Sequence, residues 1–97
     1  MTAYWVTSQV KKFGNIQRII PLPIRFGFEK GDMLHVFLSY GEEQTEFSSD
    51  VRTAGRHRYI ILHKGIMPEV RVGDYVHVRY IFEAIPQRPG EDLDDIL

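Results

Sequence analysis

Hydrophobic and polar residues alternate along much of the chain, with the period of two that is typical of half-buried β-strands. In residues 4–12, for example, Tyr4, Val6 and Val10 fall on one face and polar side chains fall on the other. The same alternation predicts five further strands, at residues 16–20, 33–38, 47–51, 57–62 and 75–80. The pattern therefore predicts an all-β fold.

Glycine and proline mark the connections between these strands. Gly14 and Asn15 predict a tight hairpin turn, because both residues tolerate a positive φ. Pro21 and Pro23 suit the entry of a helical turn but not a helix interior, and Gly27 can end such a turn. We expect one or two short helical turns in this segment.

The string GDMLHV at residues 31–36 recurs almost unchanged as GDYVHV at residues 73–78. In a Gly-Asp turn the glycine supplies the unusual dihedral, and the aspartate carboxylate accepts hydrogen bonds from backbone N–H groups. This context assigns Asp32 and Asp74 to turns that lead into strands, so we do not interpret them as a catalytic carboxylate pair.

The match between the two halves extends toward the N-terminus. At a shift of 41 positions, residues 6–20 align with residues 47–61, which predicts that Ile20 is equivalent to Ile61. Such a match, which keeps glycines and an aspartate in order, indicates an internal duplication.

Each copy has about 40 residues and is too small to bury a core alone. We therefore expect the two copies, at about residues 4–39 and 45–81, to pack on each other as one domain of residues 1–85 with pseudo-twofold symmetry.

The composition excludes several classes of chemistry. The chain has no cysteine, so disulfides, thiol catalysis and cysteine-based zinc sites are excluded. Its first residues lack the apolar core of a signal peptide and no apolar run is long enough to span a membrane, so we expect a cytoplasmic protein. No motif of a hydrolase, nucleotide-binding loop or metalloprotease is present, and we expect neither catalysis nor a cofactor.

The charges are unevenly distributed. Residues 86–97, PQRPGEDLDDIL, contain four acidic residues and are predicted to be a disordered acidic tail. Without those four, nine acidic residues remain against twelve lysines and arginines, so residues 1–90 carry a formal charge of +3.

The feature order of the first copy resembles the AbrB/SpoVT swapped-hairpin family. Gly14 matches the hairpin glycine of that family, Ile20-Pro21 the end of the strand, Arg25 the arginine four residues after the proline, and Gly31-Asp32 the turn into the last strand. The segment between Arg25 and Asp32 is about two residues shorter than in the family pattern. The resemblance implies a cradle-loop barrel built from two strand-hairpin-strand-turn-strand halves, here supplied by one chain.

The resemblance also implies a transcriptional regulator that binds double-stranded DNA through basic side chains in and near the hairpins. Independently of it, two basic hairpins related by pseudosymmetry predict contacts with phosphates and guanines. The candidate DNA-binding residues are Lys11, Lys12, Arg18 and Arg25 in the first copy, and Arg52, Arg56 and Arg58 in the second.

Several alternatives remain open. The acidic, apolar residues 86–97 resemble the toxin-binding tail of MazE-type antitoxins, so the chain is alternatively an antitoxin that binds a toxin protein. A protein-interaction barrel related to double-psi barrels, without DNA affinity, is a further alternative. His35 and His77 occupy equivalent strand positions, but we interpret them as polar-face residues and expect no metal site. The assembly is expected to be a monomeric pseudo-dimer or a homodimer.

Overall fold

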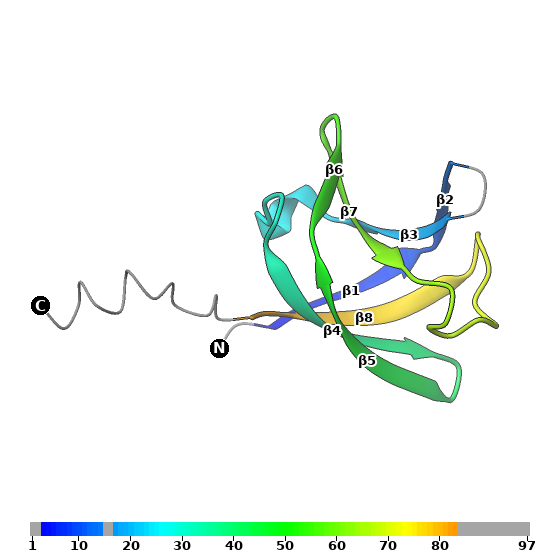
Figure 1. Ribbon diagram of the computed structural model, residues 1–97. Coiled ribbons are helices and arrows are strands. Elements are labelled where there is room, and N and C mark those ends of the chain that lie inside the picture. The colour runs from blue at the N-terminus through cyan, green and yellow to red at the C-terminus, as the bar shows by residue number, and fades with distance from the viewer. Residues whose placement is uncertain (1–2, 15–16, 84–97) are drawn as a thin grey trace, which may run out of the picture.

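Eight strands in two four-stranded antiparallel sheets make up the fold in the computed structural model, which describes residues 3–14 and 17–83 (Figure 1). The long-strand sheet has the order β1 (Ala3–Gln9), β8 (Tyr75–Phe82), β4 (Met33–Tyr40) and β5 (Glu43–Asp50). The hairpin sheet has the order β2 (Lys11–Phe13), β3 (Gln17–Leu22), β7 (His57–Leu62) and β6 (Arg52–Ala54). The all-β prediction is confirmed.

Strands of the two sequence repeats interleave in both sheets. Strand β1 pairs with β8, β4 pairs with β5 and with β8, and β3 pairs with β7. Each of these four ladders joins one repeat to the other. Only the β2–β3 and β6–β7 hairpins pair within one repeat. Both sheet orders are thus symmetric about a line between their two central strands.

The two Gly-Asp turns close in the same way, as the sequence predicts. Gly31 and Gly73 have φ values of 90° and 98°. The Asp32 carboxylate accepts a hydrogen bond from the Glu29 N–H at 2.8 Å, and the Asp74 carboxylate accepts one from the Arg71 N–H at 2.8 Å. Each aspartate therefore holds its turn by satisfying a backbone donor.

Each Gly-Asp turn also binds the other half of the chain. Val51 accepts from the Gly31 N–H at 2.9 Å and donates to the Asp32 carbonyl at 2.8 Å. Val10 makes the equivalent pair of bonds with Gly73 and Asp74, both at 2.8 Å. These two valines are where the chain passes from the long-strand sheet to the hairpin sheet, so the single strand predicted for residues 4–12 is two strands.

The expected barrel is not closed. In the part of the chain that the structure describes, the strand ladders form two separate sheets rather than one continuous ring. At Val10 and Val51 the chain changes sheet, and the backbone groups of each valine bond to a Gly-Asp turn there.

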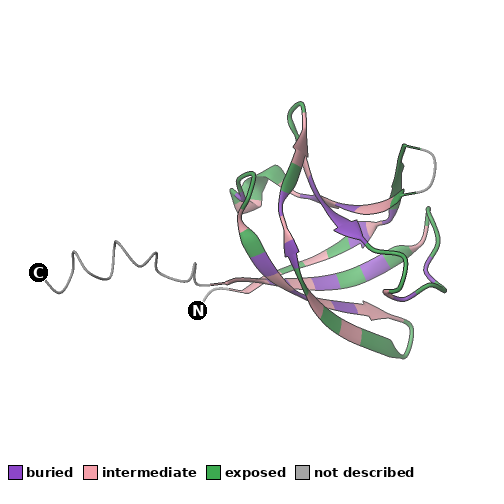
Figure 2. Ribbon diagram, in the orientation of Figure 1, coloured by how far each residue is buried: buried purple, intermediate pink, exposed green. Residues whose placement is uncertain are grey.

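The core lies between the inner faces of the two sheets (Figure 2). The alternation predicted for β4 and β8 is confirmed, because every second side chain is buried from Leu34 to Leu38 and from Val76 to Tyr80. These core residues are Leu34, Val36, Leu38, Val76, Val78 and Tyr80 from the long-strand sheet, and Ile20, Leu22, Ile60 and Leu62 from the hairpin sheet.

The predicted alignment of Ile20 with Ile61 is wrong by one residue. Across the β3–β7 ladder Ile20 pairs with Ile60, and both side chains are fully buried. In the first hairpin, three residues lie between the paired residues Phe13 and Gln17. In the second hairpin, two residues lie between the paired residues Ala54 and His57. The turn of the first hairpin therefore holds one extra residue. A slip of one position along a strand would move every side chain to the other face of the sheet, so the residues after the two hairpins are equivalent at a shift of 40 positions and not 41.

A single 3₁₀ turn, η1 (Ile24–Phe26), follows β3 and ends at Gly27, whose φ is 70°. This agrees with the expected short helical turn. No helix in the described residues is long and apolar enough to cross a membrane.

The Tyr80 hydroxyl provides a test of the core. The Tyr80 side chain is fully buried and its ring packs edge-on against Phe28, with centroids 5.9 Å apart, but its hydroxyl has no hydrogen-bond partner in the described residues. We predict that Tyr80→Phe raises the free energy of unfolding by about 1 kcal/mol at neutral pH, because an unsatisfied buried hydroxyl is removed.

Burial also raises the pKa of the Tyr80 hydroxyl. Below the ordinary tyrosine pKa both the folded and the unfolded chain keep this proton, whereas above it only the unfolded chain releases the proton. The parent chain should therefore lose stability more steeply than Tyr80→Phe as the pH rises past about 10. Urea unfolding of both proteins at neutral and alkaline pH measures this, and a destabilised variant would contradict it.

Candidate nucleic-acid interface

Positive charge is concentrated on the hairpin sheet. Its strands and the β6–β7 turn contain six cationic and no acidic side chains, namely Lys11, Lys12, Arg18, Arg52, Arg56 and Arg58. The long-strand sheet has one cation, Arg79, against the acidic residues Glu43, Glu46 and Asp50. The strands of the hairpin sheet are thus basic, and those of the long-strand sheet are acidic.

The two basic hairpins lie at opposite edges of the hairpin sheet, and both rise on the side away from the long-strand sheet (Figure 1). An aromatic stack joins them. The Phe13 ring in β2 stacks on the Tyr59 ring in β7 with centroids 5.2 Å apart, across the intervening β3. Since Tyr59 is buried, this stack fixes one hairpin relative to the other.

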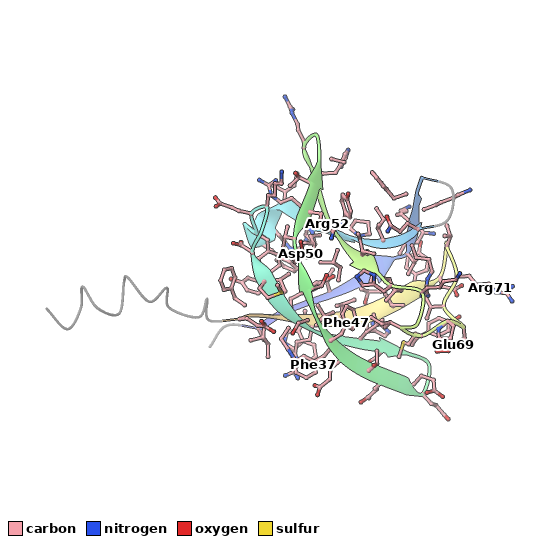
Figure 3. All side chains as sticks on the ribbon, viewed as in Figure 1. Phe37, Phe47, Asp50, Arg52, Glu69 and Arg71 are labelled. Atoms are coloured by element: carbon pink, nitrogen blue, oxygen red, sulfur yellow. The ribbon has the colours of Figure 1, made fainter. Side chains whose placement is uncertain are left out.

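Four of the predicted DNA-binding side chains are exposed on these hairpins: Lys11, Lys12, Arg52 and Arg56. Two of the four have weak local partners. The Lys11 ammonium donates to the Gln9 side chain at 2.7 Å, and the Arg52 Nε lies 3.5 Å from the Asp50 carboxylate (Figure 3). Exposed contacts of this kind contribute little free energy, so these cations are available to an anionic partner.

Arg25 is also exposed, in η1, with its guanidinium 5.0 Å from the centroid of the Phe26 ring. Leu22, at the end of the strand before this turn, pairs with Arg58 in β7. Arg25 therefore belongs to the same end of the hairpin sheet as the second hairpin.

Arg18 has a different role from the other predicted site residues. Its terminal nitrogens donate to four backbone carbonyls of the 63–74 loop, at 2.7 to 3.0 Å, namely those of His63, Ile66, Met67 and Val70. These four bonds use every N–H of Nη1 and Nη2. Burial lowers the pKa of the Arg18 guanidinium, and the charge of Glu69 acts in the opposite direction. Arg18 is thus committed to shaping the loop.

Arg58 is the counterpart of Arg18 after the one-residue correction, since each lies two positions before the paired isoleucines Ile20 and Ile60. It is half-buried, and its Nε has no hydrogen-bond partner in the described residues. The two equivalent arginines therefore differ in their surroundings.

Three cations outside the hairpins adjoin this surface and were not predicted. Lys30 and Arg52 line one hollow of about 340 Å³, whereas Lys64 and Arg71 line a groove of about 690 Å³ beside Arg18. Their positions depend on how the loops fold back on the hairpin sheet, which the alternation of residues does not report.

The long-strand sheet offers no metal centre in the described residues, where no group of three or more His, Asp or Glu side chains is placed to hold an ion. His35 contacts the Glu46 carboxylate at 3.3 Å, and His77 contacts the Thr7 hydroxyl at 2.8 Å. The pair formed by Phe37 and Arg79 lies between them in the ladder.

Comparison of the chain with models of known protein families, with curated proteins and with solved structures finds no match.

We predict that Arg18→Met lowers the free energy of unfolding by about 2 to 3 kcal/mol and speeds hydrogen exchange at the Ile66 and Val70 amides, because four carbonyls lose a charged donor. Arg18→Lys should recover only part of the loss, since one ammonium cannot replace a planar fork. The matched control is Arg58→Met, which should cost less. Equal costs at the two positions would contradict this role for Arg18.

Proposed function

We propose that this protein is a DNA-binding transcriptional regulator of the AbrB-like class, which contacts double-stranded DNA through its hairpin sheet. The observation that carries the proposal is the separation of charge between the two sheets. Six cations without an acidic side chain lie on the hairpin sheet, and the acidic side chains of the strands lie on the other sheet.

This arrangement suits a polyanion in two ways. A duplex approaching the hairpin sheet meets cations and avoids the acidic sheet, which favours one orientation of the encounter. Two β-hairpins can also contact phosphates and reach base edges in a major groove. The exposed cations Lys11, Lys12, Arg52 and Arg56 are assigned to phosphate contacts, and Arg25 is assigned to the same surface.

The class assignment rests on the resemblance of the first copy and is supported by the interleaving of the strands. Two swapped-hairpin halves are expected to exchange partners, as β1 does with β8 and β5 with β4. In this proposal one chain supplies both halves, so a single chain presents both hairpins to DNA.

A protein-interaction module is the second candidate, favoured by the outer face of the long-strand sheet. Trp5 is 69% exposed there, and the Arg79 guanidinium lies 5.1 Å from its ring and 3.9 Å from the Phe37 ring. An exposed tryptophan beside a stacked arginine is typical of protein interfaces. The antitoxin alternative depends on residues 86–97, which lie outside the described residues.

A salt titration of binding to duplex DNA tests the proposal. We predict that the slope of log affinity against log salt concentration becomes shallower by about 2 in the Lys11→Ala, Lys12→Ala double variant, because each lost phosphate contact removes about 0.9.

The control restores the net charge at the β4–β5 turn and the start of β5, away from the hairpin sheet. Glu42→Gln and Glu43→Gln are added to the double variant, which returns the formal charge to that of the parent chain. If Lys11 and Lys12 contact phosphates directly, this quadruple variant should bind DNA as weakly as the double variant. Recovery of parental binding would show a dependence on net charge alone, and a parent chain that does not bind duplex DNA at low salt would refute the function.

A further inference from the structure

The groove beside Arg18 combines an apolar floor with a cationic rim. Ile61, Val70 and Pro68 contribute apolar surface, and Val72, which is 49% exposed, extends it outward. Lys64 and Arg71 are exposed at its rim, and Arg71 lies at the end of the molecule formed by the 63–74 loop (Figure 3). Such a surface suits a segment that carries both apolar and acidic side chains.

The groove is held in shape before any ligand arrives. Arg18 binds four carbonyls of the 63–74 loop, and the Asp74 carboxylate fixes its far end by accepting from the Arg71 N–H at 2.8 Å and from the Tyr40 hydroxyl at 3.0 Å. A preformed groove avoids most of the entropic cost of ordering a loop on binding.

We propose that this groove binds residues 91–97 of the same chain. Their sequence, EDLDDIL, has four carboxylates and three large apolar side chains within seven residues. In the proposed complex Leu93 and Ile96 cover the apolar floor, and the neighbouring carboxylates face Lys64 and Arg71.

The length of the chain permits this contact. Strand β8 runs away from the 63–74 loop toward Glu83, and its eight residues span about 26 Å. Ten residue steps separate Glu83 from Leu93, enough for about 33 Å when extended. The segment can therefore return along the molecule to the groove, at the high effective concentration of an intramolecular ligand.

The hollow lined by Lys30 and Arg52 lacks these properties. It is smaller, at about 340 Å³, and it contains the acidic Asp50 next to Lys30 and Arg52. An acidic segment would meet a like charge in the lining itself there, whereas Glu69, the acidic residue of the 63–74 loop nearest Arg18, is not part of the lining of the groove.

Under the proposed function, a docked segment would bring carboxylates close to the first basic hairpin and compete with DNA. Docking itself does not rest on DNA binding, and the experiment below contains no DNA. A failure of docking and a failure of the proposed function are therefore separate results.

Paramagnetic relaxation in the full-length chain tests the proposal. Because the chain has no cysteine, Gly90→Cys accepts a single nitroxide label next to the intact segment. We expect the label to broaden the amide resonances of residues 61–64 and 69–72. The broadening should be lost in Lys64→Glu with Arg71→Glu, and it should persist in the matched control Lys30→Glu with Arg52→Glu.

A second variant changes none of the residues that the structure describes. Leu93→Ser with Ile96→Ser should also abolish the broadening at the groove, because it removes the apolar contacts and keeps every charge. Broadening that shows no preference for the groove, or that survives both the charge reversal and the serine variant, would overturn the proposal. Broadening that appears on an unlabelled chain mixed with labelled chain would mean that a second copy is the source, and would overturn docking within one chain.

Discussion

The fold depends on four backbone hydrogen bonds that join each half of the chain to the Gly-Asp turn of the other. Val10 is held by Gly73 and Asp74, and Val51 is held by Gly31 and Asp32. At these two residues the chain leaves the long-strand sheet, after β1 and after β5, and enters the hairpin sheet. Since neither repeat is large enough to bury a core alone, the bonds do more than close two turns: they fix the register at which the halves share one core.

The same crossing points determine where the charges lie. Strands β1 and β5, which end directly before Val10 and Val51, belong to the long-strand sheet, and strands β2 and β6, which begin directly after these valines, belong to the hairpin sheet. The basic stretches that begin at Lys11 and Arg52 therefore fall together on one sheet, although 40 residues separate them in the sequence. The basic surface therefore forms because the chain changes sheet at these two points. If β1 and β5 continued within the long-strand sheet, the two basic stretches would lie at its opposite edges.

Much of this fold could be predicted from the sequence, because alternation reports directly which side chains of β4 and β8 are buried, and because a Gly-Asp turn has few conformations. The break at Val10 could not, since it arises from a partner 63 residues away and leaves the alternation intact. The role of Arg18 was also hidden. On a strand beside a basic hairpin it has the appearance of a surface cation, and only the return of the 63–74 loop over β3 supplies the four carbonyls that engage it.

The departures from twofold symmetry carry the most functional information. The duplication that the sequence indicates would begin with two equivalent ends, so a feature present at only one end would have been gained or lost since. Arg18 organises a loop and a groove, whereas its counterpart Arg58 leaves its Nε without a partner in the described residues. The Phe13–Tyr59 stack is likewise unmatched, because Ala54 stands where the second hairpin would need its own aromatic ring. Paired hairpins suit a ligand that is itself nearly twofold symmetric, as duplex DNA is, and a single groove suits a partner that binds once. Under the proposed function, one chain could therefore present a symmetric surface to DNA while it keeps one end for a separate contact.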